Sequence, residues 1–269
     1  MKGRVLIIAG SDSGGGAGIQ ADIKAVTAMG GYAATAITAI TVQNTLGVHG
    51  VHPLPLDLIE AQARAVLDDI GADAIKTGML GSVAVVERVA AILDSSGAVA
   101  VVDPVMVAKG GAALLDEDAV QAVRALMIPR AGLFTPNAPE AEALTGIAVT
   151  DLDGQRRAGE ALLKLGARAV LMKGGHVPGT SVVDLLLTPV SETLLEGERV
   201  DTTSTHGTGC TLASAIAAGL ALGRPLNVAV AEGWAYVAEA IRRAPGLGGG
   251  HGPLDHGWPL RDAAERRPR

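Results

Sequence analysis

Short, continuously apolar runs alternate along this chain with longer segments of helical periodicity, and that alternation limits the fold more than any other feature. The runs VLIIAG, VAVVD and AVLMKG are apolar at nearly every position, as in strands that are buried on both faces of a parallel sheet. Alternation of such strands with helices predicts an α/β fold, with helices covering both faces of a mainly parallel central sheet.

The expected elements can be placed from these patterns. Strands are predicted at Arg4–Ala9, Tyr32–Val42, Ala74–Thr77, Val99–Val102, Gly132–Thr135 and Ala169–Met172. Helices are predicted at Ala17–Met29, Leu56–Ile70, Ser82–Leu93, Asp116–Met127, Pro139–Leu144 and Leu152–Leu165. Two β-like runs in Ser181–Val200 predict an antiparallel hairpin at a sheet edge. Two further helices are expected, one ending near Leu222 and one at Pro225–Arg243.

The size of the chain fits one domain. Its 269 residues, 48% of them hydrophobic, can bury a large core, and the sequence has no internal repeat or low-complexity linker to mark a boundary. We therefore expect a single domain over residues 1–260, followed by a frayed tail at 261–269.

Charge and cysteine content narrow the possible partners. The formal net charge is −6, and basic residues do not cluster before 261–269, which argues against nucleic-acid binding. The single cysteine allows no intramolecular disulfide, and no apolar run reaches the roughly 18 residues that span a membrane. A cytoplasmic protein without membrane contact is expected.

The glycine-rich loop GSDSGGGAG, Gly10–Gly18, follows the first expected strand and precedes a helix. It therefore lies at the carboxyl edge of the sheet, where open α/β folds bind ligands. Its spacing matches neither the dinucleotide fingerprint nor the P-loop. Either the loop is only a tight turn, or its backbone contacts a small substrate, with Asp22 as a polar contact one turn into the helix.

Gln43 stands at the carboxyl end of the next expected strand, in TVQN. A carboxamide has an acceptor and two donors, so it can pair with the adjacent ring nitrogen and amino group of an aminopyrimidine. The alternative is a solvated residue that ends the strand.

Acidic and amide side chains follow two later strands. Asp103 ends VVD before a proline, and Asn137 and Glu140 lie three residues apart in TPNAPE. Carboxylate oxygens are preferred by Mg²⁺, directly or through its waters. The same residues also fit a turn and a helix N-cap with its capping-box partner, and both interpretations can hold together.

Lys173 ends another strand, before Gly174 and Gly175. It is either a surface residue or a cation that pairs with phosphate. His176 and His206 are candidate polar contacts, and the chain has no zinc-binding spacing.

The stretch THGTGCTLASAIAAG, Thr205–Gly219, contains the only cysteine, Cys210, at the start of a small-residue helix. Gly207 and Gly209 permit a tight turn that aims free N–H groups of the helix N-terminus inward. Such a site suits a phosphoryl group in transfer. The alternative for Cys210 is a small hydrophobic residue in the core.

Seven motifs resemble, in order, those of the hydroxymethylpyrimidine/phosphomethylpyrimidine kinases of thiamine biosynthesis, in the ribokinase-like superfamily. They are AGSDSGGGAGIQADIKA, ITVQNTLGV, KTGMLGS, DPVMVAKGG, TPNAPEAEALTG, LMKGGH and THGTGCTLASAIAA. The resemblance extends from about Val5 to Trp258. It implies transfer of phosphate from ATP to 4-amino-5-hydroxymethyl-2-methylpyrimidine and then to the monophosphate, and a dimer would fit the family.

The resemblance also implies a role for each site residue. The pyrimidine would be held by Gln43, with Asp22, Gly10 and Met79 around it. Mg²⁺ and its waters would be organised by Asp103, Asn137 and Glu140, and the nucleotide phosphates would be lined by Lys173 and Thr205. The backbone of Gly207, Thr208, Gly209 and Cys210 would form the anion hole.

Cys210 occupies the position where most of the superfamily has an aspartate base. A helix N-terminus lowers a thiol pKa, so a thiolate near neutral pH is an expectation. Phosphoryl transfer depends mainly on positioning and electrostatics, so the backbone N–H groups are expected to matter more than the side chain.

Two other functions remain open. A pyridoxal kinase of the same superfamily would phosphorylate a similar ring hydroxymethyl group, and a non-catalytic sensor would bind thiamine precursors without turnover. Lys109, in VAKGG, belongs either to a closing flap or to an ordinary surface turn.

Overall fold

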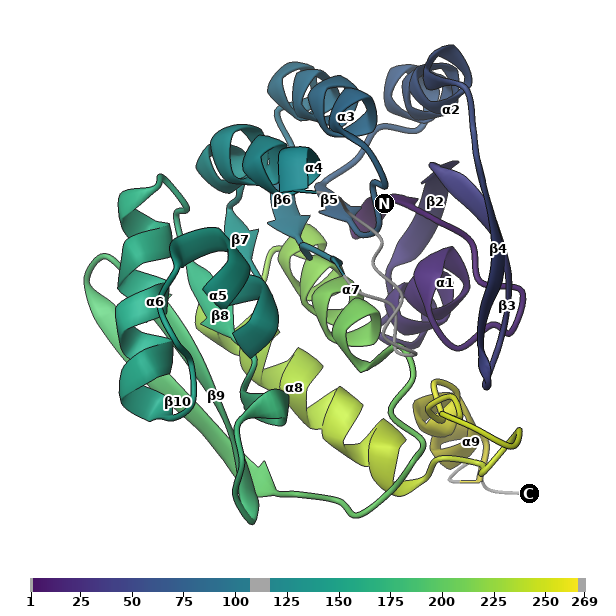
Figure 1. The fold of residues 1–269 in the computed structure, drawn as a ribbon. Coiled ribbons are helices and arrows are strands. Elements are labelled where there is room, and N and C mark those ends of the chain that lie inside the picture. Colours follow the sequence, from purple (N-terminus) through teal and green to yellow (C-terminus); the bar gives the residue numbers. More distant parts are fainter. Residues whose placement is uncertain (1, 107–116, 266–269) are drawn as a thin grey trace.

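The computed structural model describes residues 2–106 and 117–265. Its main sheet has the order β10-β9-β8-β7-β6-β5-β1-β2, and a second, two-stranded sheet pairs β3 with β4 (Figure 1). The strands are β1 Arg4–Ala9, β2 Tyr32–Ile37, β3 Ala39–Asn44, β4 Gly47–Pro53, β5 Ala74–Thr77, β6 Val99–Val102, β7 Leu133–Phe134, β8 Val170–Met172, β9 Ser181–Thr188 and β10 Ser191–Glu198. Strands β1, β2 and β5–β8 run parallel, while the β9–β10 hairpin is antiparallel, as predicted.

Helices cover both faces of the main sheet. They are α1 Gly18–Ala28, α2 Leu56–Asp69, α3 Val83–Ser96, α4 Glu117–Ala122, α5 Ala138–Thr145, α6 Leu152–Lys164, α7 Thr208–Ala221, α8 Leu226–Arg242 and α9 Trp258–Glu265. The pleat of β1 divides two cores: Leu6 and Ile8 pack with α2, α3, α5 and α6, whereas Val5 and Ile7 pack with α1, α7 and α8. No helix in the described part of the chain is long and apolar enough to cross a bilayer.

The expected strand Tyr32–Val42 is two strands. Residues Tyr32–Ile37 pair with β1, but after Thr38 the chain leaves the main sheet and pairs with β4, which the sequence analysis missed. The sequence of β4, GVHGVHP, has two glycines and little apolar character, because this ribbon projects from the sheet and is largely exposed. The β3–β4 register shifts between Val42 and Gln43, next to the cavity described below.

Two other expectations differ from the structure. The helix expected at Asp116–Met127 is described from Glu117 and changes at Val123 to a π-helical turn, in which Ile128 N donates to Val123 O. The tail is helical rather than frayed through Glu265, since it belongs to α9. Residues 266–269 lie outside the described range, as does Lys109.

Side-chain contacts explain the order in this C-terminal helix. Arg243 lies 5.2 Å from the centre of the Trp258 ring and forms a 2.7 Å ion pair with Asp262. Trp258 Nε1 also donates to Tyr236 O at 3.2 Å. These contacts fix α9 against α8.

Candidate active site

A cavity of about 640 Å³ opens at the carboxyl ends of the parallel strands. Every predicted site residue except Asp22 lines it: Gly10, Gln43, Met79, Asp103, Asn137, Glu140, Lys173, Thr205, Gly207, Thr208, Gly209 and Cys210. These residues come from loops that are far apart in sequence but follow neighbouring strands, which is how this edge of an α/β sheet assembles a site. The two sequence candidates His176 and His206 also line it.

Asp22 is not a substrate contact. Its side chain is fully buried, and its two oxygens lie 2.8 and 2.9 Å from Nζ of Lys76, which is also fully buried. Ser214 Oγ donates to the same carboxylate at 2.7 Å. Burial raises the pKa of Asp22, while Lys76 acts to lower it. The sequence analysis missed Lys76, although a lysine within the buried run AIKT requires such a partner.

The turn before α7 requires glycine at position 207. Gly207 has φ of 79°, and a Cβ there would lie 1.8 Å from Gly16 O. A Cβ on Gly209 would lie 3.1 Å from Lys173 Nζ, so the backbone closely approaches that cation. Thr211 N donates to Gly207 O at 2.9 Å, and the N–H groups of Gly209 and Cys210 lie in this first turn of α7, ahead of the residues that have an intrahelical acceptor. A helix N-terminus of this kind is suited to binding an anion.

The thiolate expectation for Cys210 is wrong for the free protein. The thiol is half-buried. Burial raises its pKa to about 11, Lys76 acts to lower it, and the carboxylates of Asp22 and Asp103 act to raise it further. The position at a helix N-terminus does not overcome burial beside two acids, so the thiol is neutral near pH 7.

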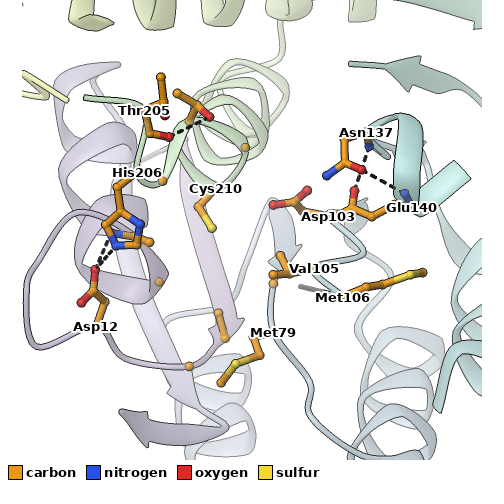
Figure 2. Close-up of a pocket in the computed structure, with 18 of the residues that line it drawn as sticks. Asp12, Met79, Asp103, Val105, Met106, Asn137, Glu140, Thr205, His206 and Cys210 are labelled. Carbon is orange, nitrogen blue, oxygen red and sulfur yellow. Dashed lines mark hydrogen bonds and ion pairs between the residues drawn. The ribbon is translucent and has the colours of Figure 1, made fainter. Parts of the chain in front are cut away.

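Two acids, Asp103 and Glu140, lie on the opposite wall (Figure 2), and the cation Lys173 lines the same cavity. Lys173 Nζ lies 2.8 Å from Asp103 Oδ1 and 3.8 Å from Glu140 Oε2. Burial acts to lower the pKa of Lys173, but the two carboxylates outweigh it and raise that pKa. Burial raises the pKa of Glu140 to about 7, against the effect of Lys173 and with a contribution from Asp103.

Asn137 and Glu140 also form the expected capping box of α5. Asn137 Oδ1 accepts from Glu140 N at 2.9 Å, and Glu140 Oε2 accepts from Asn137 N at 2.8 Å. The described residues contain no group of three His, Cys, Asp or Glu side chains arranged to hold a metal. Two carboxylates beside a cavity fit a hydrated Mg²⁺ held partly by substrate phosphates, which is the usual form of magnesium binding.

Asp12 is a further site residue that the sequence analysis missed. Its carboxylate accepts from the N–H groups of Gly14, Gly16 and Ala17 and lies 2.8 Å from His206 Nε2 (Figure 2). Burial acts to raise the pKa of Asp12, but the hydrogen bonds from His206 and the backbone outweigh it and lower that pKa. The signal in the sequence was an aspartate two residues before a run of glycine N–H donors.

A second hollow of about 250 Å³ adjoins the main cavity and shares Lys173, Thr205, Thr208 and Gly209 with it. Its other wall includes Trp234, on α8, and apolar side chains of α7 and α8. A polar, cationic end that opens into an apolar slot suits a ligand with a phosphate group and a flat ring.

Known proteins are similar to this chain over nearly its whole length. Residues 12–255 match the sequence profile of the family described as phosphomethylpyrimidine kinase. The hydroxymethylpyrimidine/phosphomethylpyrimidine kinase of Streptomyces coelicolor is 51% identical over 256 residues, which cover 95% of each protein. The thiamine biosynthesis bifunctional protein ThiED of Geobacter sulfurreducens is 48% identical, over 98% of this chain and 54% of that protein.

A solved structure extends the comparison to the fold. The ADP complex of Bacillus subtilis pyridoxal kinase superposes with a TM-score of 0.90 at 37% identity, covering 97% of this chain and 99% of that one. The fold is therefore that of the vitamin kinases in the ribokinase-like superfamily, as predicted. The extent and identity of the sequence matches settle the group within it: the chain belongs to the phosphomethylpyrimidine kinase family.

Proposed function

We propose that this protein phosphorylates 4-amino-5-hydroxymethyl-2-methylpyrimidine with ATP and then phosphorylates the monophosphate, as a step of thiamine biosynthesis. The observation that carries the proposal is one cavity with a carboxamide, Gln43, together with the anion hole at Gly207–Cys210 and the cation Lys173. The names of the relatives in Streptomyces and Geobacter support it.

The pyrimidine lies against Gln43, whose amide pairs with a ring nitrogen and the adjacent amino group. Gly10 and Met79 line the same part of the cavity. A Cβ on Gly10 would lie 2.5 Å from the end of the Met79 side chain, so the two residues form a close-packed wall. This wall excludes water from one side of the ring.

The phosphates of ATP lie between Lys173, Thr205 and the start of α7, with the base in the hollow beside Trp234. Lys173 exchanges its bond with Asp103 for one with phosphate, and the N–H groups of Gly209 and Cys210 stabilise charge on the transferred group. Asp103 and Glu140 would hold the waters of a bound Mg²⁺, and Asn137 fixes Glu140 through the capping box. The metal neutralises phosphate charge when it is bound.

The test is ATP-coupled turnover of the pyrimidine, its monophosphate and pyridoxal by the same preparation. We expect both pyrimidines to react with kcat/KM at least about tenfold above that of pyridoxal, since Gln43 pairs with two groups of the aminopyrimidine. Gln43→Ala should raise the KM for the pyrimidine and leave that for ATP nearly unchanged. Preference for pyridoxal would assign the chain to the second activity, and ligand binding without ADP release would favour a sensor.

A homodimer in the cytoplasm is part of the proposal. The β3–β4 ribbon exposes Ile40, Val42, Leu46 and Val51, at 43%, 62%, 69% and 45% of their surfaces, which suits contact with a second copy. The lone cysteine is consistent with a reducing compartment. Sedimentation equilibrium tests the dimer, and a monomer at micromolar concentration would refute it.

A further inference from the structure

His206 contacts both Asp12 and the side-chain amide of Gln43, and these contacts restrict which end of the amide faces His206. Asp12 Oδ2 accepts from Gly16 N at 3.0 Å and from Ala17 N at 2.8 Å, and it lies 2.8 Å from His206 Nε2. A carboxylate held by backbone donors is an acceptor only. The ring nitrogen that faces it must therefore be the donor, so His206 carries its proton on Nε2.

The same nitrogen of His206 also faces Gln43. Gln43 Nε2 lies 3.0 Å from His206 Nε2, and Gln43 Oε1 lies 3.4 Å from Thr41 Oγ1. Thr41 Oγ1 donates its single proton to Ser11 O at 2.8 Å, so it can only accept from Gln43. With the amide in this direction, two donors meet at His206 and two acceptors meet at Thr41.

A half-turn of the Gln43 amide places its oxygen toward His206, where Asp12 Oδ2 and Gln43 Oε1 share the single Nε2–H as a three-centre bond, and places its N–H groups toward Thr41 Oγ1, which can accept. The oxygen and nitrogen ends of a carboxamide have nearly the same shape, so the hydrogen-bond partners decide which end faces which neighbour. His206 and Thr41 both require the same direction, with the oxygen toward His206 and the nitrogen toward Thr41. His206 and Asp12 are nearly buried, with side chains 8% and 2% exposed, so water does not readily replace either partner.

We propose that the Asp12–His206 pair determines substrate specificity by fixing the Gln43 amide with its oxygen toward His206 and its nitrogen toward Thr41. This inference rests on the proposed function in taking Gln43 as the residue that binds the pyrimidine. One lone pair and one N–H of the amide then remain for the ligand, in a fixed order. His206 and Asp12 are positioning residues, because they act through Gln43.

The order of donor and acceptor on the amide matters because the two ends of the pyrimidine's pairing edge carry different neighbouring substituents. In an aminopyrimidine with the amino group at C4, the 5-hydroxymethyl group lies beside the amino donor and the 2-methyl group lies beside the N3 acceptor. If the amide were reversed, the ring would have to turn over to pair, and the two substituents would exchange places. The fixed amide therefore directs the hydroxymethyl group to one side of the cavity, and it rejects rings with the opposite donor and acceptor order.

The test compares kcat/KM for the 4-amino pyrimidine with that for its 4-oxo analogue, which presents an N3–H donor and an O4 acceptor. Wild type should prefer the amino compound by at least about 100-fold, because the wrong ring leaves buried polar groups unpaired. In His206→Phe the amide is free to turn, and the preference should fall by about tenfold or more. His206→Gln supplies N–H donors toward Asp12 and Gln43 and should retain the preference.

The KM for ATP should stay the same in all three proteins, which separates this effect from general damage to the fold. An unchanged preference in His206→Phe would overturn the inference. If that variant does not fold, Thr41→Val replaces it, since loss of the other partner should reduce the preference in the same direction.

A second measurement needs no turnover. The ¹⁵N signals of the His206 ring in the unliganded wild-type protein should identify the Nε2–H form, and a ring protonated on Nδ1 alone would refute the assignment. If wild type phosphorylates neither pyrimidine, the proposed function fails, while the ring signals still test how His206 faces Asp12 and Gln43.

Discussion

Two buried lysine–aspartate pairs lie on the same sheet, but only one of them faces the cavity. Lys173, directly after β8, pairs with Asp103 at 2.8 Å, and their side chains are 12% and 1% exposed. Lys76, within β5, pairs with Asp22 at the same distance, and neither side chain is exposed. The lysine–carboxylate distances are alike, but only the first pair lines the cavity.

Access determines what each charge can do. Lys173 lines the cavity, so an incoming phosphate can replace Asp103 as its partner. Lys76 is enclosed by α1, α7 and Gly78, where a Cβ would lie 3.0 Å from its Nζ. Its ammonium can act on the site only through its field, which lowers the pKa of Cys210 and is opposed by Asp22. The first pair is suited to binding and the second to structure.

The largest expected effect is on catalysis when the pair that faces the cavity, Lys173–Asp103, is broken. Lys173→Met should lower kcat by about 10³-fold or more, because a cation that stabilises the transferred phosphoryl group is lost. Its effect on stability should be the smaller of the two lysine variants, since Asp103 can still be solvated from the cavity. Steady-state kinetics and urea unfolding measure both. Lys164→Met, on the exposed end of α6, is the matched control and should change neither.

Breaking the enclosed pair should mainly affect folding. Lys76→Met leaves the Asp22 charge buried and unpaired, which costs about 3–5 kcal/mol of unfolding free energy. Adding Asp22→Asn removes the charge, keeps an acceptor for Ser214, and should recover most of that loss. Urea midpoints of the single and double variants decide the point. If Lys76→Met were as stable as wild type but inactive, Lys76 would have a direct role in the reaction.

The same contrast explains what the sequence could predict about the site. Polar residues at the ends of apolar runs, such as Asp103 and Lys173, follow a regular rule, because carboxyl ends of parallel strands meet at one edge. Asp22 follows the loop after β1 by only one helical turn. Where its side chain points depends on which face of α1 packs inward, and its contact with the buried Lys76 shows that it points into the core. Its expected role as a substrate contact was therefore wrong.

Prediction of the fold from the sequence was limited in the same way, by contacts that leave no local pattern. Buried strands such as β1 and β6 have the predicted bounds, because continuous burial leaves a clear pattern in the sequence. The β3–β4 ribbon projects into solvent, where alternation is weak, so the turn at Thr38 was missed. The role of Asp12 was missed for another reason: it depends on His206, which is 194 residues away in the chain.

The smallest expected effect is that of Cys210. Burial raises the pKa of its thiol, Lys76 acts to lower that pKa, and Asp22 and Asp103 act to raise it, so both pairs act on it. Cys210→Ala should lower kcat by roughly tenfold while activity remains detectable, because the backbone N–H groups of the anion hole remain. The pKa of this thiol is raised to about 11. The thiol is therefore protonated below that pH, and the ratio of wild-type to variant kcat should stay constant from pH 6 to 9 within about twofold.

A thiolate base would give a different result. The wild-type rate would then rise with pH as the thiol lost its proton, and the ratio to Cys210→Ala would rise with it. Lys76→Met offers a second check. Lys76 lowers the pKa of the Cys210 thiol, so its removal should raise that pKa further. The kcat ratio with and without the thiol should then still not change with pH. A ratio that rises about tenfold per pH unit below pH 8 would mean that ligand binding creates the thiolate that the free protein lacks.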